Sequence, residues 1–213
     1  TEPVITSAKQ AGDFARELQL MLRYLGVSEA NMEKGEMRVE ANVSVAPEGE
    51  RSPVYVEIKN LNSFRTMEKA VEYEIKRQIA VLESGGKLEK QTLGWDEAKQ
   101  ATFPQRSKEG SADYRYFPDP DLPSLKLSEI EEYSASKLTA ELPELPAQRR
   151  ERYLALGITL EDPDAYIRDM SLAGLLDLGL GQCGADGNAK AGLTCTHALQ
   201  RHGILGRRHG VGS

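Results

Sequence analysis

Residues 38–62 read RVEANVSVAPEGERSPVYVEIKNLN, and this stretch decides the fold. Apolar and polar residues alternate on both sides of a break rich in proline, glycine and charge. That pattern is typical of two strands, each with one dry and one wet face. We expect the strands to pair antiparallel in the one register that keeps the dry faces together, because a one-residue slip would mix the faces. The expected pairs are Ala41–Ile58, Val43–Val56 and Val45–Val54.

The wet face of this hairpin carries polar residues that could hold a cation and a phosphate. The register places Asn42 opposite Glu57 and Glu40 opposite Lys59. Carboxylate and amide oxygens suit Mg²⁺, which in turn binds nucleotide phosphates, and a lysine can act as a point charge on a phosphate. The alternative is a solvated sheet face with an ordinary cross-strand ion pair between Glu40 and Lys59.

The segment KNLNSF, residues 59–64, ends the second strand and begins a helix. Free N–H groups at a helix start attract phosphate, so Asn60, Asn62 and Ser63 could support a nucleotide. Capping of the helix by Asn62 or Ser63 explains the same residues without a ligand. The sequence has no Gly-rich loop of the P-loop kind, so any nucleotide binding uses another geometry.

Two helices flank the hairpin. Residues 7–25 keep apolar positions 11, 14, 18, 21, 22 and 25 on one face, with Ser7 as N-cap. A longer helix follows Ser63 and ends at Gly85, and its charged residues, Glu74 among them, should face solvent. Its expected core stripe consists of Phe64, Met67, Val71, Ile75, Ile79 and Leu82.

Residues 88–95 and 113–117 are predicted as further strands. In the second of these, Arg115 could clamp a phosphate or a carboxylate with its planar guanidinium. The tyrosines on either side of it are the kind of residue that packs in a core or at a sheet edge. Residues 105–110, QRSKEG, form a basic loop that could contact a phosphate backbone or simply be solvated.

The totals exclude several classes of protein. The 213 residues, 39% apolar and with a net charge of −6, suit one or two globular domains without a broad basic field. No apolar stretch approaches the roughly 20 residues of a membrane span, and the N-terminus lacks the pattern of a signal peptide. Two cysteines indicate a reducing compartment. All His and Cys residues follow residue 180, at spacings unlike a zinc site, so the main body lacks His or Cys chemistry.

The composition changes towards the C-terminus, where ten of the nineteen glycines follow residue 173 without a proline. We therefore expect a main domain over residues 1–127. Residues 128–170 should form a linker, with a short helix near 128–138 and the start of a helical domain. Residues 171–213 should form an irregular or non-native tail, which a shifted reading frame would produce.

Several segments together resemble the B subunit of the aspartyl/glutamyl-tRNA amidotransferase, over about residues 3–155. They are MRVEANVSV, VEIKNLNSF, AVEYEIKRQIAVLESGG, GWDEAK, RSKEGSADYRYFPDPDLP and LPELPAQRRERY. The resemblance implies an α+β fold: part of a cradle domain with a mixed or antiparallel sheet and packed helices, followed by a helical domain. It also implies a protein of the cytoplasm, or of an organellar matrix in a eukaryote, that makes no contact with membranes.

The resemblance further implies a reaction and partners. Such a B subunit works with a glutamine-hydrolysing A subunit and a small C subunit on misacylated tRNA(Gln) or tRNA(Asn). It uses ATP and Mg²⁺ to phosphorylate the carboxylate of the attached Glu or Asp, and ammonia from the A subunit then displaces the phosphate. No protein nucleophile is needed, which agrees with a main body free of His and Cys.

The resemblance assigns roles to the polar residues described above. Glu40 and Glu57 would be metal ligands, and Lys59 and Arg115 would contact the phosphate or the reacting carboxylate. The supporting polar groups for the cofactor would be Asn42, Asn60, Asn62 and Ser63. Family members carry an upstream Glu/His segment that this sequence does not contain, and many have Asp where Glu40 stands, so we expect the chain alone to be inactive. The alternatives are a docking module for tRNA or another subunit, without chemistry of its own, and an unrelated α/β structural protein.

Overall fold

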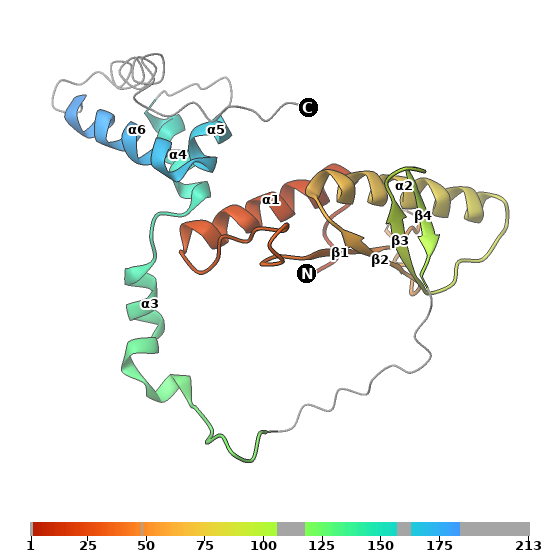
Figure 1. Cartoon of the computed structure of the whole chain (residues 1–213), viewed down its shortest axis with the longest axis horizontal. Coiled ribbons are helices and arrows are strands. Elements are labelled where there is room, and N and C mark those ends of the chain that lie inside the picture. Colours follow the sequence, from red (N-terminus) through yellow and green to blue (C-terminus); the bar gives the residue numbers. More distant parts are fainter. Residues whose placement is uncertain (1, 48, 106–117, 157–162, 184–213) are drawn as a thin grey trace. The chain divides into compact units, whose positions relative to one another are not determined.

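The computed structural model describes residues 2–47, 49–105, 118–156 and 163–183. The chain divides into two units, Thr1–Ala140 and Glu141–Ser213, which are described separately. The first unit is α+β, as the alternation and the helical periodicity predict (Figure 1). Within the described residues, no helix has both the length and the apolar character of a membrane span.

A four-stranded mixed sheet in the order β1-β2-β3-β4 forms the first unit. β1 (Val39–Val43) pairs antiparallel with β2 (Val56–Leu61), which pairs parallel with β3 (Gln91–Asp96). The parallel step requires a crossover, and α2 (Phe64–Glu83) supplies it. β4 (Ala101–Pro104) pairs antiparallel with β3. The sequence did not predict β4, because four residues are too short to show an alternation.

The hairpin register is confirmed at its centre and differs at its open end. Ala41–Ile58, Asn42–Glu57 and Val43–Val56 pair as predicted. Val39 then pairs with Leu61, so β2 holds one extra residue there. Asn60 lies in this bulge with φ 60°, and asparagine tolerates this left-handed conformation better than most residues. The predicted pair Val45–Val54 lies beyond the ends of both strands.

α1 (Ala8–Tyr24) begins where the sequence predicts, since the Ser7 hydroxyl accepts a hydrogen bond from the backbone N–H of Gln10 at 3.2 Å. The predicted apolar face is only partly correct. Phe14 is 43% exposed, and the buried residues are Gly12, Ala15, Leu20 and Tyr24. The reason is that small residues bring α1 close to α2, so the contact face is set by size as well as by hydrophobicity.

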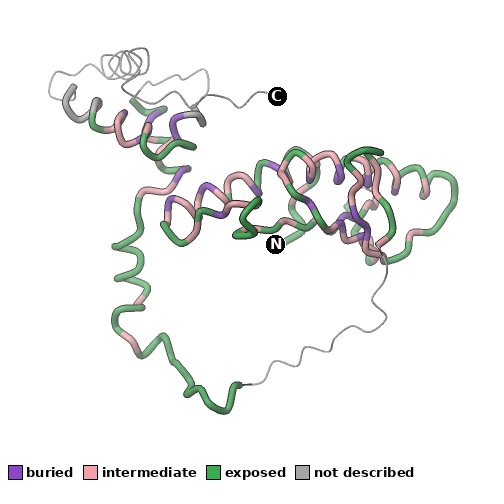
Figure 2. Tube along the Cα trace, in the orientation of Figure 1, coloured by how far each residue is buried: buried purple, intermediate pink, exposed green. Residues whose placement is uncertain are grey.

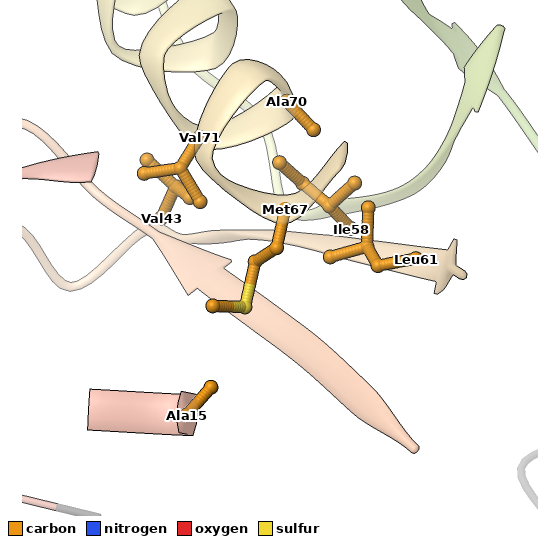
Figure 3. Close-up of a cluster of buried hydrophobic side chains, with 7 residues drawn as sticks. All are labelled: Ala15, Val43, Ile58, Leu61, Met67, Ala70 and Val71. Atoms are coloured by element: carbon orange, nitrogen blue, oxygen red, sulfur yellow. The ribbon is translucent and has the colours of Figure 1, made fainter. Parts of the chain in front are cut away.

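The core of the first unit joins α1, α2 and the first two strands (Figure 3). Its buried residues are Ala15, Val43, Ile58, Leu61, Met67, Ala70 and Val71. The predicted stripe of α2 holds for the first half of the helix and fails in the second, where Ile79 and Leu82 are exposed (Figure 2). Glu74 and Gln78 are buried there instead.

Glu74, predicted to face solvent, is completely buried and accepts hydrogen bonds from three residues. Arg77 donates to it from Nε at 2.9 Å and from Nη2 at 2.6 Å, and Gln78 Nε2 donates at 2.9 Å. Thr102 Oγ1, on β4, donates at 3.3 Å. Gln78 Nε2 also donates to the carbonyl of Val43 at the end of β1, 3.1 Å away. This polar network therefore ties α2 to both edge strands of the sheet.

Short helices lead out of the first unit. Two 3₁₀ turns, η1 (Leu127–Glu129) and η2 (Glu131–Tyr133), precede α3 (Ala135–Glu141). The sequence predicted a single helix over residues 128–138. The difference is small, because 3₁₀ turns commonly stand beside short helices.

The second unit contains α4 (Pro146–Ala155), α5 (Pro163–Arg168) and α6 (Met170–Cys183). Residues 171–183 are therefore helical, where the sequence predicted an irregular tail. The apolar residues Ala173 and Leu176 are buried, and their contacts stabilise a helix despite its glycines. The remainder of the predicted tail, residues 184–213, lies outside the described residues.

Candidate functional site

Three of the predicted site residues meet on the polar face of the sheet. Along β2, Ile58 is fully buried on the core face, and Glu57 and Lys59 point to the other face. The Lys59 Nζ atom lies 3.3 Å from Glu57 Oε1 and 3.7 Å from Glu40 Oε2. The two carboxylates predicted to bind a metal therefore lie on the same side of the sheet, within reach of one cation.

The ammonium group of Lys59 is the cation that these carboxylates share. The hydrogen bond to Glu57, together with the charges of Glu40 and Glu57, raises the pKa of Lys59 above its ordinary value. Lys59 is therefore protonated at neutral pH, and two carboxylates with one ammonium leave a net charge of −1. Such a cluster attracts a further cation and repels a free phosphate.

A cleft of about 470 Å³ opens beside this cluster. It is lined by Asn42, Tyr55, Glu57, Lys90, Gln91, Thr92, Pro104 and Gln105. The hydroxyl of Thr92 donates to Glu57 Oε2 at 3.2 Å, so one carboxylate oxygen is held by β3 and the other faces Lys59. Glu57 and Asn42 thus join the polar face to the cleft, while Glu40 is absent from its described lining.

The structure does not bring Asn60, Asn62 and Ser63 into the cleft. Asn60 and Asn62 are exposed, and Asn60 forms the β-bulge. Ser63 is the N-cap of α2: its hydroxyl accepts from Thr66 N at 3.0 Å and donates to Thr66 Oγ1 at 2.9 Å. These contacts match the capping alternative for Ser63. Arg115 lies outside the described residues.

Comparison with known proteins identifies the family. The family described as the GatB/GatE catalytic domain matches residues 1–132. The chain belongs to the GatB/GatE family. The match contains all four strands and both long helices of the first unit, including the polar face with Glu40, Glu57 and Lys59.

Curated relatives within the GatB/GatE family agree in name. The B subunit of the chloroplastic/mitochondrial glutamyl-tRNA(Gln) amidotransferase of Physcomitrium patens is 47% identical over 83% of this chain and 31% of that protein. The B subunit of the aspartyl/glutamyl-tRNA(Asn/Gln) amidotransferase of Crocosphaera subtropica is 49% identical over 81% of this chain and 35% of that protein. The relative of the same name from Nostoc sp. is 44% identical over 90% of this chain and 38% of that protein.

The chain spans about a third of the length of these relatives. An alignment that covers 90% of the chain must continue past residue 155. The similarity therefore extends further along the sequence than the segments that first suggested the family, and it includes residues of the second unit.

Magnesium, which the family resemblance implies, can be tested against these residues. The described residues hold no group of three or more His, Cys, Asp or Glu side chains that could bind a metal by themselves. Glu40 and Glu57 nevertheless offer hard oxygen atoms around a position that a cation, Lys59 Nζ, already takes. One or two carboxylates are the usual protein share of a magnesium–nucleotide site, in which water and phosphate oxygens complete the shell. The pair fits that role.

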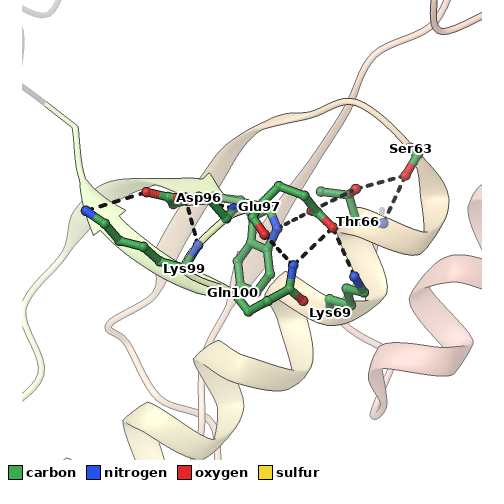
Figure 4. Close-up of polar contacts among 9 residues, drawn as sticks. Ser63, Thr66, Lys69, Asp96, Glu97, Lys99 and Gln100 are labelled. Atoms are coloured by element: carbon green, nitrogen blue, oxygen red, sulfur yellow. Dashed lines mark hydrogen bonds and ion pairs between the residues drawn. The ribbon is translucent and has the colours of Figure 1, made fainter.

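A second polar cluster, not predicted from the sequence, lies around Glu97 in the turn between β3 and β4 (Figure 4). Glu97 accepts hydrogen bonds from Lys69 Nζ at 2.9 Å, Trp95 Nε1 at 2.7 Å and Gln100 Nε2 at 3.0 Å. These donors, Lys69 foremost, lower the pKa of Glu97 to about 2. Its donors come from α2 and from the turn itself, so the cluster fixes the turn against the start of the helix. It does not line the cleft.

Proposed function

We propose that this chain acts as the B subunit of a glutamine-dependent tRNA amidotransferase, in the ATP-dependent conversion of Glu-tRNA(Gln) and Asp-tRNA(Asn) to Gln-tRNA(Gln) and Asn-tRNA(Asn). The names of its relatives and the chemistry of its sheet support the proposal. The observation that carries it is the convergence of Glu40 and Glu57 on one cation, at the edge of a cleft that Glu57 also lines.

Each residue of the polar face has a role in this proposal. Glu40 and Glu57 hold the magnesium ion of the nucleotide, and the bound ion neutralises phosphate charge. Lys59, no longer paired to both carboxylates, can then donate to a phosphate oxygen or to the carboxylate that reacts. Asn42 offers an amide at the floor of the cleft. Arg115 is assigned to the phosphate or to the reacting carboxylate, as the family resemblance implies.

The three residues that precede α2 act indirectly in this proposal. Asn60 shapes the β-bulge and Ser63 caps the helix, so both position β2 and its polar residues. Asn62 lies between them, exposed, where it can support a bound cofactor. The activation step then depends on position and charge rather than on a protein nucleophile, as is usual for phosphoryl transfer.

The proposed partners are a glutamine-hydrolysing subunit, a small third subunit and the misacylated tRNA. The proposed location is the cytoplasm, or an organelle in a eukaryote, in keeping with the names of the bacterial and the chloroplastic/mitochondrial relatives.

An amidation assay tests the proposed function. The full chain, assembled with its partner subunits, is given glutamine, Mg²⁺, ATP and Glu-tRNA(Gln) or Asp-tRNA(Asn), and the amidated product is measured. We expect Glu57→Gln to lower the rate at least about 100-fold, because a metal-binding carboxylate is lost. Glu72→Gln is the matched control, since Glu72 also pairs with a lysine, Lys76, but on the exposed side of α2. Equal rates for the two variants would refute the proposal.

A further inference from the structure

The cleft has charges of opposite sign in its lining. Glu57 supplies a carboxylate, and Lys90 is the only basic side chain among the described residues of the lining. Lys59 belongs to the neighbouring cluster, where Glu40 and Glu57 together outweigh its charge. The cation that a bound phosphate would meet inside the cleft is therefore Lys90 rather than Lys59.

Lys90 is held by an aromatic ring instead of a carboxylate. Its Nζ atom lies 4.4 Å from the centroid of the Tyr55 ring, a cation–π contact, and Tyr55 lines the same cleft. Within the described part of the chain, Lys90 makes no ion pair with Asp or Glu. The ring orients the ammonium group without cancelling its charge, so the group can still bind an anion.

We infer that Lys90, oriented by Tyr55, binds a phosphate group of the nucleotide in this cleft. The inference rests on the proposed function and deepens it. The remaining lining suits such a ligand, because the hydroxyl of Thr92 and the amides of Gln91 and Gln105 are neutral hydrogen-bonding groups. A magnesium-bound polyphosphate then has its cation beside Glu57 and one of its phosphates beside Lys90, which matches the two charges of the cleft.

Titration of the full chain with ATP and with adenosine, both with Mg²⁺, tests this inference. We expect Lys90→Gln to weaken ATP binding about tenfold, as the loss of one charge-assisted contact does, and to leave adenosine binding unchanged. It should also flatten the salt dependence of ATP binding, because one charge is removed. Lys90→Arg should restore most of the affinity. Lys87→Gln is the matched control, since Lys87 is an exposed lysine three residues away that does not line the cleft.

The outcomes separate this inference from the proposed function. If Glu57→Gln abolishes magnesium-dependent ATP binding and Lys90→Gln behaves like Lys87→Gln, the role of Lys90 is refuted and the proposed function stands. If Lys90→Gln weakens ATP and adenosine equally, Lys90 supports the wall of the cleft and does not bind phosphate. If the unaltered chain binds no ATP with or without Mg²⁺, the proposed function fails, and the inference fails with it.

Discussion

Glu72 and Glu74 lie two residues apart on α2 and carry the same charge, but the Glu72 side chain is 61% exposed and Glu74 is fully buried. The helical period turns Glu74 towards the sheet, where Arg77, Gln78 and Thr102 satisfy its oxygens. A buried carboxylate persists only with such partners. At the scale of single residues, the role of an acid is therefore set by the donors around it.

Glu74→Gln should destabilise the first unit. The substitution leaves the guanidinium of Arg77, 29% exposed, without its carboxylate, and we expect the free energy of unfolding to fall by about 2–4 kcal/mol. Glu72→Gln removes a pair that is exposed on both sides and should cost less than about 0.5 kcal/mol. Urea unfolding of the two variants measures the difference. Equal stabilities would show that the network around Glu74 contributes nothing.

Asn60 offers a residue-scale test of backbone role against ligand contact. Its φ of 60° suits glycine, so Asn60→Gly should change the stability by less than about 0.5 kcal/mol and retain nucleotide binding. Asn60→Ala should cost about 1 kcal/mol, because a Cβ disfavours this conformation. Thermal unfolding and ATP titration measure the two effects. Loss of ATP binding in a well-folded Asn60→Gly variant would show that the amide itself contacts the nucleotide.

At the scale of elements, an ion-pair network joins α4 to α6. Glu144 accepts from Arg152 Nε at 2.7 Å and from Arg149 Nε at 2.9 Å. Arg152 Nη2 also lies 2.9 Å from Asp177 Oδ1, which accepts a hydrogen bond from the hydroxyl of the buried Tyr153 at 3.0 Å. Hydrogen bonds from the arginines, Arg152 foremost, lower the pKa of Glu144 to about 2, against an ordinary value of 4.5.

This network makes the stability of the second unit depend on pH. Because the pKa of Glu144 is lower in the folded state, its contribution, about 3 kcal/mol, is present above pH 4.5 and is lost as the pH falls towards 2. Glu144→Gln should therefore lower the stability at pH 7 and make little difference at pH 2. Unfolding followed by far-UV circular dichroism at both pH values measures this. A constant difference between the two proteins across that range would contradict the assignment.

The regular elements of the first unit follow closely from the sequence, because period-two alternation and serine caps are local signals. The centre of the hairpin register and the start of α2 at Ser63 were predicted in this way. The bulge at Asn60, the short β4 and the buried Glu74 depend on contacts between distant segments, which a local pattern does not contain. In the same way, Glu40, Glu57 and Lys59 could be placed on one face from the alternation, but Lys90 reaches the cleft only through the parallel pairing of β3 with β2.

At the scale of the whole molecule, the two units have separate interiors. The core of the first unit involves α1, α2 and the sheet, and the buried residues of the second unit lie in α4, α5 and α6. The single tryptophan, Trp95, belongs to the first unit, where its ring meets Tyr73 edge to face at 6.0 Å between centroids. Its fluorescence therefore reports on the first unit alone.

Independent unfolding of the two units follows from this separation. Glu144→Gln should shift the loss of helical circular dichroism that belongs to the second unit and leave the midpoint of Trp95 fluorescence unchanged. Glu74→Gln should do the reverse. Urea titrations that record both signals on the same samples measure this. A shift of both signals by either variant would show that the units unfold as one.

The central claim is that Glu40 and Glu57 on the polar face of the sheet bind the cation that carries ATP. Calorimetric titration of ATP into the full chain, with and without Mg²⁺, tests it most directly. The account predicts binding that requires Mg²⁺, that is lost in Glu57→Gln and weakened in Glu40→Gln, and that is retained in Glu72→Gln. Magnesium-dependent ATP binding of unchanged affinity in Glu57→Gln would contradict it.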